Sequence, residues 1–360
     1  MNNKIDEILK ESVDFTILQG KKNMDFEVFS FLCYVLEHVE RGKIEISIRT
    51  QSMLMFSALI HKKKINMMKS ISKEYIEYLN NIIIDKYLND VKSDIRNSDI
   101  VCLATCLSDN SFIKLSNVIN NQKNVMKRKR AMHLLSFSEE KRCLQILKNV
   151  TPNGFVLIPA GKFVFGSSNS LDEKYKKDVW LPSYYISIYP VTKTAYDNGD
   201  ISLLSDKNSI PCHGITWYSA YEFCTRYGLS LPTEAQWEKS MRGCDGRYYP
   251  WGNKFNKHAV NSFEGNIADF TPVGFFEGKG SSPYGVVDCV GNCWEWTSSI
   301  YDRYETEKFK CGVDDSVRGD RVLRGGAYDF DRYGVTCTNR YRCNPNNGWD
   351  THGFRVVINI

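Results

Sequence analysis

A short run of oxygen-bearing residues in the second half of the chain has the spacing of a metal site. Asp288 and Glu295 lie seven positions apart, with Gly291 and Cys293 between them. Two carboxylates combined with backbone carbonyl oxygens suit calcium, which takes roughly six to eight oxygen ligands. These four residues therefore predict a calcium site. The alternative is that Glu295 only caps a local turn.

Twelve cysteines would suit a disulfide-linked scaffold in a short secreted chain. This chain has 360 residues, and its first ten are polar and charged, without the apolar stretch of a signal peptide. No run reaches the roughly 18 apolar residues that a membrane span needs. We therefore expect reduced thiols, a cytoplasmic location and no membrane anchor. Because no paired C-x-x-C motifs occur, we expect no structural zinc.

Residues 327–353 lack four residue types that are common elsewhere in the chain. The whole chain contains 30 Lys, 19 Glu, 5 Gln and 9 Met, so a window of 27 residues should hold about five of them, and this window holds none. Nearly all residues present have codons with a pyrimidine at the third base, as adenine-directed mutagenesis of asparagine codons would produce. Trp349 is the exception and would be a fixed position. The alternative is a polar surface loop of chance composition.

The residue types in this window also suit molecular recognition. Tyrosine, tryptophan and arginine offer large contact areas and strong hydrogen bonds, while glycine, asparagine, threonine and aspartate adapt to a partner. Binding residues concentrate on loops that a rigid scaffold holds in place. We expect the ligand-binding side chains to be Tyr328, Asp329, Phe330, Asp331, Tyr333, Tyr341, Arg342, Cys343, Asn344, Asn346, Trp349, Asp350, Thr351 and His352.

The first 150 residues predict an all-α domain. Apolar residues recur at helical spacing over 29–39 and 76–87. This half contains only two glycines and no proline, so helix breakers are scarce. It carries 24 Lys and Arg against 18 Asp and Glu, but this net charge of +6 is spread out apart from runs at 62–64 and 127–130. We therefore expect neither catalysis nor nucleic-acid binding from this half.

Residues 151–360 predict an α+β domain with little regular secondary structure. Strands are expected at 155–159, 184–188 and 355–360, each near turn-forming residues. Helices are expected at 217–227 and 232–241, and Thr233 with Gln236 has the spacing of a capping box. A domain with long loops needs large core side chains, and tryptophan supplies them. The expected anchors are Trp217, Trp237, Trp251, Trp294 and Trp296.

Several sequence blocks in this second half resemble the formylglycine-generating enzyme (FGE) family, and they occur in the family's order. The blocks are VLIPAGKF (156–163) with GS (166–167), YI (185–186) with PVT (190–192), ITW (215–217), LPTEAQWE (231–238), YPWGN (249–253), VGNCWEWT (290–297), RGG (324–326) and GFRV (353–356). The resemblance covers roughly 210 residues and implies a C-type-lectin-like fold. It says nothing about residues 1–150.

The resemblance also bears on metals. In the family, positions matching Asp288 and Glu295, with the carbonyls of Gly291 and Cys293, form a calcium site. A second family site would draw on Asn261 and Asp269, in a stretch that is shorter here. Iron-dependent relatives that build carbon–sulfur bonds need clustered histidines, whereas the six histidines of this chain are far apart and form no H-x-x-x-H pair. We therefore expect no iron.

The oxidases of the family hold copper(I) with two thiolates placed soon after the Gly-Gly block. The matching positions here are Phe330 and Val335, and neither has a thiol. Cys337 and Cys343 lie six positions apart and would have to form a rearranged pair. Copper is therefore not expected. A copper-dependent oxidase that acts on a peptidyl cysteine stays as the alternative hypothesis.

The composition of residues 327–353 is similar to that of the variable proteins of diversity-generating retroelements. The resemblance includes the framing residues at 324–326, 339–340, 345 and 353–355. Those proteins use the same lectin-like fold to display a hypervariable ligand-binding face. The resemblance implies a non-catalytic binding protein whose partner is a protein or another macromolecule. A near-copy of the coding segment beside a reverse transcriptase gene would distinguish this hypothesis from the enzymatic one.

Overall fold

The computed structural model describes residues 84–85, 87–89, 104, 107–120, 123–167, 176–301 and 319–360. The chain divides into two compact units, Met1–Ser138 and Glu139–Ile360. The helix expected at 29–39 lies outside the described residues, as does most of the helix expected at 76–87. None of the helices in the described part is both long and apolar enough to cross a bilayer.

The described part of the first unit is helical, as expected. It contains α6 (Asp109–Asn120) and α7 (Val125–Ser136). Leu115 and Ile119 of α6 are buried, as are Leu134 and Leu135 of α7, so each helix contributes an apolar face to the core of this unit.

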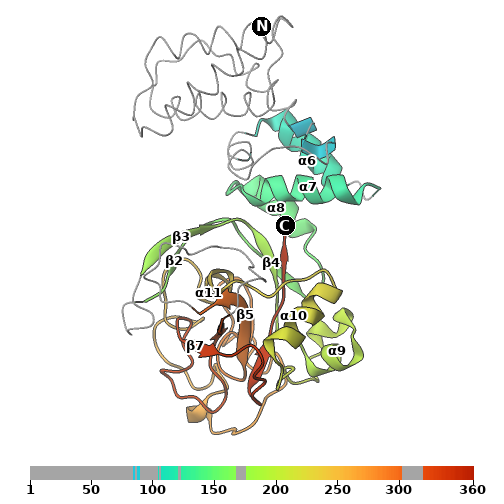
Figure 1. The fold of residues 1–360 in the computed structure, drawn as a ribbon. Coiled ribbons are helices and arrows are strands. Elements are labelled where there is room, and N and C mark those ends of the chain that lie inside the picture. Colours follow the sequence, from blue (N-terminus) through green and yellow to red (C-terminus); the bar gives the residue numbers. More distant parts are fainter. Residues whose placement is uncertain are drawn as a thin grey trace, which may run out of the picture. The chain divides into compact units, whose positions relative to one another are not determined.

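The second unit begins before the predicted boundary at residues 150–151. Helix α8 (Lys141–Asn149) belongs to it, and the hydroxyl of Tyr185 donates to the carbonyl of Leu147 over 2.7 Å. The other helical elements are α9 (Lys193–Asn198), α10 (Trp217–Arg226), α11 (Glu234–Arg242) and the short 3-10 helices η1 (Ile201–Ser205) and η2 (Phe263–Gly265). In Figure 1, α9 and α10 lie side by side at one edge of this unit.

Three small sheets form the rest of the second unit. One has the order β1-β4-β9, with β1 (Phe155–Ile158), β4 (Tyr184–Ser187) and β9 (Val357–Asn359) antiparallel to their neighbours. Strands β2 (Gly161–Phe165) and β3 (Lys177–Leu181) form a two-stranded antiparallel sheet. The largest sheet has the order β7-β6-β5-β8, built from β5 (Trp294–Ile300), β6 (Arg321–Arg324), β7 (Arg340–Cys343) and β8 (His352–Phe354), and only its β5–β8 pair is parallel.

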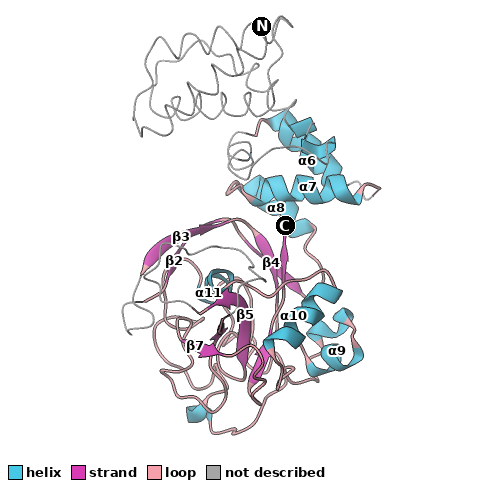
Figure 2. Cartoon of the chain, in the orientation of Figure 1, coloured by secondary structure: helices cyan, strands magenta, loops and turns pink. Residues whose placement is uncertain are grey.

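Loops connect these elements and make up most of the second unit, as Figure 2 shows. The predicted α+β class with little regular secondary structure is confirmed. The predicted strands and helices are confirmed with ends shifted by up to two residues. The Thr233 side chain accepts from the backbone N–H of Gln236, and the Gln236 side chain accepts from the backbone N–H of Thr233, so the predicted capping box is present.

The core of the second unit is anchored by tryptophans. Trp217, Trp237, Trp294 and Trp296 are at most 3% exposed, whereas Trp251 is half-buried and was wrongly expected to be a core anchor. Each buried indole needs a hydrogen-bond acceptor. The indole N–H of Trp217 donates to the carbonyl of Thr297 at 2.8 Å, and that of Trp296 to the carbonyl of Ile215 at 2.7 Å. These bonds fasten the start of helix α10 and the loop before it to strand β5.

Candidate binding face

The segment 327–353 leaves strand β6, forms a compact turn, contributes strand β7 and returns through a loop to β8. Two glycines precede it because the backbone turns sharply there. Gly326 has φ of +78°, and a Cβ at this position would lie 2.6 Å from the carbonyl oxygen of Gly334. No other residue type fits that approach, so the turn that starts the segment depends on glycine.

Most of the side chains predicted to bind a ligand are exposed. Tyr333 is 78% exposed, Trp349 62% and Tyr341 51%. Tyr328, Phe330 and Thr351 are half-buried. The remaining exposed members of the predicted set are Asp329, Asp331, Arg342, Asn344, Asn346 and Asp350.

Two members of the predicted set are buried, and the prediction was wrong for them. Cys343 is 5% exposed and His352 is 3% exposed. Cys343 ends β7, where its backbone pairs with Arg321, and His352 begins β8, where its backbone pairs with Trp294. Their side chains therefore support the segment from inside and belong to the scaffold.

The backbone of the segment is held by residues outside it. Trp294 donates its backbone N–H to the carbonyl of Thr351 at 2.8 Å. Further backbone bonds of this kind join Phe263 N–H to the carbonyl of Phe330, Cys337 N–H to that of Tyr248, Trp217 N–H to that of Pro345, and Ile215 N–H to that of His352. Backbone bonds do not depend on side-chain identity, so this support persists when exposed side chains change.

The ring of Trp294 supports the segment from below. It is 3% exposed and meets Phe330 edge-on, with ring centroids 5.2 Å apart. It also packs against Tyr341, with centroids 5.7 Å apart. Half-exposed Phe330 and Tyr341 thus rest on one buried indole, which restricts the positions that their rings can adopt.

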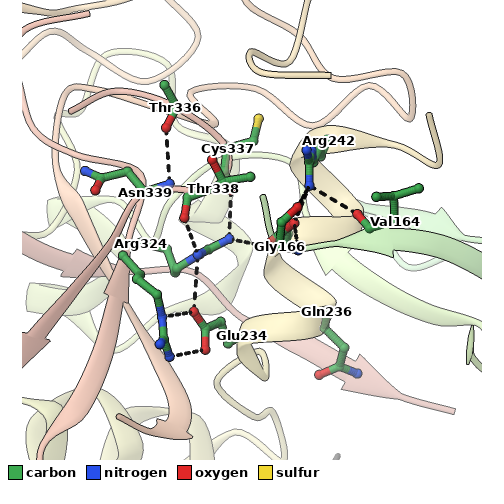
Figure 3. Close-up of polar contacts among 12 residues, drawn as sticks. Val164, Gly166, Glu234, Gln236, Arg242, Arg324, Thr336, Cys337, Thr338 and Asn339 are labelled. Atoms are coloured by element: carbon green, nitrogen blue, oxygen red, sulfur yellow. Dashed lines mark hydrogen bonds and ion pairs between the residues drawn. The ribbon is translucent and has the colours of Figure 1, made fainter. Parts of the chain in front are cut away.

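A buried network of charged side chains joins helix α11 to strands β6 and β7, and Figure 3 shows part of it around Glu234, Arg242 and Arg324. Glu234, Glu238 and Arg242 recur every four residues on α11 and so share one face of that helix. Arg324 and Arg340 are paired across β6 and β7. All five side chains are at most 3% exposed. Like charges opposite each other on a sheet repel, so the two arginines need the carboxylates of α11 between them.

Each carboxylate of the network pairs with two arginines. Arg340 donates to both carboxylate oxygens of Glu234 at 2.8 Å. Arg324 donates to Glu234 at 3.2 Å and to Glu238 at 2.5 Å, and Arg242 donates to Glu238 at 2.7 Å. Burial raises the pKa of Glu238, and the two neighbouring arginines only partly oppose that rise. Removing either carboxylate would leave buried arginines without a charged partner.

The network also positions the segment directly. Arg324 donates to the carbonyl of Cys337 at 2.7 Å and to that of Thr338 at 2.9 Å. Cys337 and Thr338 are buried and lie two to three residues before β7. A guanidinium group holds them at fixed positions because its donors are rigid and planar. The charged network therefore connects α11 to the backbone that leads into β7.

The family model of the sulfatase-modifying factor enzyme 1-like domain matches residues 145–360, which is more than half of the chain. The chain belongs to this family. The match confirms the FGE-type domain that the sequence blocks indicated.

Curated relatives include both an enzyme and a protein described as inactive. The formylglycine-generating enzyme of Bos taurus is 30% identical over 220 residues, which cover 54% of this chain and 56% of that protein. Inactive C-alpha-formylglycine-generating enzyme 2 of Bos taurus is 33% identical over 176 residues, covering 44% and 54%. The chain thus spans about half the length of these relatives. The solved structure of Treponema denticola variable protein 1 covers 57% of this chain and 94% of its own, with 18% identity and a TM-score of 0.45.

The calcium ligands implied by the FGE family are placed close together, but their carboxylates are engaged. Glu295 accepts from Arg355 at 2.6 and 2.7 Å and from the indole N–H of Trp237 at 2.6 Å. Asp288 accepts from the backbone N–H of Gly274 at 2.7 Å. Glu295 is therefore already neutralised by an arginine and does not fit a cation ligand as arranged. Calcium binding at Asp288, Gly291, Cys293 and Glu295 is thus a prediction from the sequence that the pairing of Glu295 with Arg355 argues against.

The second calcium site implied by the family, at Asn261 and Asp269, contains a buried oxygen atom that lacks a donor. Asn261 is 1% exposed, and among the described residues its Oδ1 has no hydrogen-bond partner, while its Nδ2 donates to the carbonyl of Asp269 at 2.9 Å. A buried oxygen without a donor is costly, and it is a group that a cation would satisfy. No group of three or more His, Cys, Asp or Glu side chains in the described part is arranged to hold a metal ion.

Cys337 and Cys343, the two thiols that a copper oxidase would need, lie at opposite ends of strand β6. Cys337 is fully buried in the apolar core with Val335 and Phe330, at the Arg324 end of β6. Cys343 pairs with Arg321, at the other end of that strand. Burial raises the pKa of both thiols, whereas copper(I) binds thiolates. The eight described cysteines are all free.

The sequence missed one part of the face. Phe263 and Glu264 of η2 and Phe270 contact the segment at Phe330, Arg332 and Tyr328. No local pattern indicates this, because the partners are about 60 to 70 positions apart and meet only in the folded domain.

Proposed function

We propose that the second unit is a non-catalytic binding module that displays the segment 327–353 to a protein or another macromolecule. One observation carries the proposal: nine of the fourteen predicted side chains are exposed, while the backbone beneath them is bonded to the scaffold. The exposed aromatic side chains Tyr333, Tyr341 and Trp349 are of the kind that dominate binding energy at protein interfaces.

The rigidity of the scaffold matters for binding. Ordering a loop or a side chain at an interface costs free energy, and a preformed face avoids much of that cost. Here backbone bonds, the Trp294 ring and the buried charges supply the order. Exposed positions can therefore change without loss of the fold, which suits diversification by a retroelement. We therefore also propose that a retroelement diversifies the exposed positions of the segment 327–353.

The alternative copper oxidase finds less support. Its expected thiol positions are Phe330 and Val335, and Cys337 is enclosed in the apolar core. A metal-binding thiolate needs an environment that stabilises its charge, and an apolar core does the opposite.

A comparison of two variants of the full chain tests the proposal. Replacing Tyr341, Arg342 and Trp349 together by alanine should lower the free energy of unfolding by no more than about 1.5 kcal/mol, because exposed side chains contribute little to stability. Replacing buried Trp237 by alanine should cost about 3–5 kcal/mol. Partners retained by the unchanged protein in a pull-down should be lost with the folded triple variant. A triple variant that unfolds as readily as the Trp237→Ala protein would show that the segment is core and would refute the proposal.

A further inference from the structure

The loop 263–270 presents apolar side chains beside the segment. Phe263 is 69% exposed and Ile267 is 41% exposed. Two of the residues around Ile267 have left-handed backbone conformations, Asn266 with φ of 55° and Ala268 with φ of 59°. Asparagine tolerates this conformation, whereas it costs an alanine such as Ala268 roughly 1 kcal/mol or more. The loop is thus held in a costly shape that leaves apolar groups in water.

The loop is fixed to the segment by bonds to its backbone. Phe263 N–H donates to the carbonyl of Phe330 at 2.9 Å. Glu264 accepts from the backbone N–H of Arg332 at 2.9 Å and from its guanidinium at 3.1 Å. Because two of these three bonds involve only the backbone of the segment, the loop keeps its place whichever side chains occupy positions 330 and 332.

A second junction brings aromatic rings from three loops together. The Tyr328 ring meets Phe270 edge-on, with centroids 5.0 Å apart. Phe270 stacks on His213, with centroids 4.3 Å apart. The Nδ1 atom of His213 lies 3.1 Å from the carbonyl oxygen of Asp350. Tyr328 and Phe270 therefore form an aromatic corner that is fixed on both sides.

Three exposed carboxylates belong to residues beside this corner: Asp329 directly follows Tyr328, Asp269 directly precedes Phe270, and the backbone carbonyl of Asp350 lies 3.1 Å from His213 Nδ1. Burial raises the pKa of Tyr328, and the negative charges of these three aspartates raise it further. Among the described residues, none of the three forms a salt bridge. The arginines of the face are already paired, Arg332 with Glu264 and Arg342 with Asp320. The corner is therefore an aromatic surface with uncompensated negative charge.

This charge suits a cationic side chain of a partner. Guanidinium and ammonium groups bind well where an aromatic ring and carboxylates are offered together, through cation–π attraction and charge complementarity. No group of three or more His, Cys, Asp or Glu side chains in the described part is arranged to hold a metal ion, so we take the partner group to be a larger organic cation.

Building on the proposed binding function, we propose that the loop 263–270 is a constant part of the binding face. Its partner is a protein that inserts an arginine or lysine side chain at the corner of Tyr328 and Phe270 and covers Phe263 with an apolar side chain. Phe263, Asp269 and Phe270 lie outside the variable segment, so the variable positions would adjust specificity around the contact that these three residues supply.

Selection from a library of random linear peptides tests this inference. The full chain is immobilised, and the selected peptides are synthesised and their Kd values measured by calorimetry. We expect enrichment of arginine and lysine. Changing Asp269, Asp329 and Asp350 together to asparagine should weaken binding at least tenfold. Phe263→Ser should do the same, whereas the matched control Phe275→Ser, which alters a ring 63% exposed that packs on Phe276, should not.

The outcomes separate the two proposals. Peptides that lack basic residues and bind equally well to the asparagine and Phe263→Ser variants would overturn this inference. If those peptides still lose affinity for the Tyr341, Arg342 and Trp349 alanine variant, the proposed binding function stands. Peptides that are indifferent to all of these changes would overturn both. Melting curves of each variant show that it is folded.

Discussion

The substitution Glu234→Gln tests whether the buried charges hold the binding face in place. Glu234 is 1% exposed and pairs with Arg340 through two bonds of 2.8 Å and with Arg324 at 3.2 Å. The network contains two carboxylates and three arginines, a net charge of +1, and the substitution raises it to +2 without a change of side-chain volume. Leaving buried charges without a partner costs about 3–5 kcal/mol.

Such a loss is large for a domain whose unfolding free energy is about 5–15 kcal/mol. For a unit of this size it lowers Tm by roughly 6–20 °C. The assay is denaturant unfolding of the full chain, combined with hydrogen exchange at the amides of β7, which should exchange faster. The matched control is Glu222→Gln, which removes an exposed ion pair with Arg226 and should cost about 0–0.5 kcal/mol. If the two variants lose equal stability, the network does not support the face as argued.

Three further expectations concern protonation and metals. Burial lowers the pKa of His352 to about 4, so its contribution to stability is present above pH 6.5 and is lost as the pH falls toward 4, by up to about 3 kcal/mol. Denaturant unfolding between these pH values should show a smaller loss of unfolding free energy in His352→Phe than in the unchanged chain, and equal losses would contradict this assignment. Burial raises the pKa of Asp288 to about 6, and its protonation changes the stability in the opposite direction. Because Asp288 is present in both proteins, its effect cancels in the comparison. Excess chelator should leave Tm equal to that in excess calcium, because Glu295 is neutralised by an arginine, and a lower Tm with chelator would restore the sequence-based calcium prediction. Substrate peptides should show no conversion of cysteine to formylglycine, and turnover with added copper(I) that Cys337→Ser or Cys343→Ser abolishes would support the enzymatic alternative.

Local features of the fold could be predicted because they depend on near neighbours in the sequence. The capping box at Thr233 and Gln236 needs only a spacing of three residues, and it is present. The strand beginning at Phe155 is bounded by turn-forming residues on both sides, and it also forms.

The individual positions of the candidate site were harder to predict. Composition marked 327–353 as surface, but it could not show that Cys343 ends a strand with its side chain buried. The pairing of Arg340 with Glu234 spans 106 positions, and that of Arg355 with Glu295 spans 60. Pairs so far apart in the sequence form only in the tertiary fold. The pairing of Arg355 with Glu295 neutralises the carboxylate that the sequence had indicated as a calcium ligand.

The central claim is that 327–353 is a face that varies while its scaffold stays constant. The most direct measurement is to sequence the DNA that encodes and flanks this segment in many isolates of the source population. We expect a near-copy of the segment beside a reverse transcriptase gene, with adenines at the differing bases. Substitutions should concentrate at exposed positions such as Tyr333 and Tyr341, while Arg340 and Trp349 stay constant. A segment that is invariant among isolates and has no near-copy would contradict the claim.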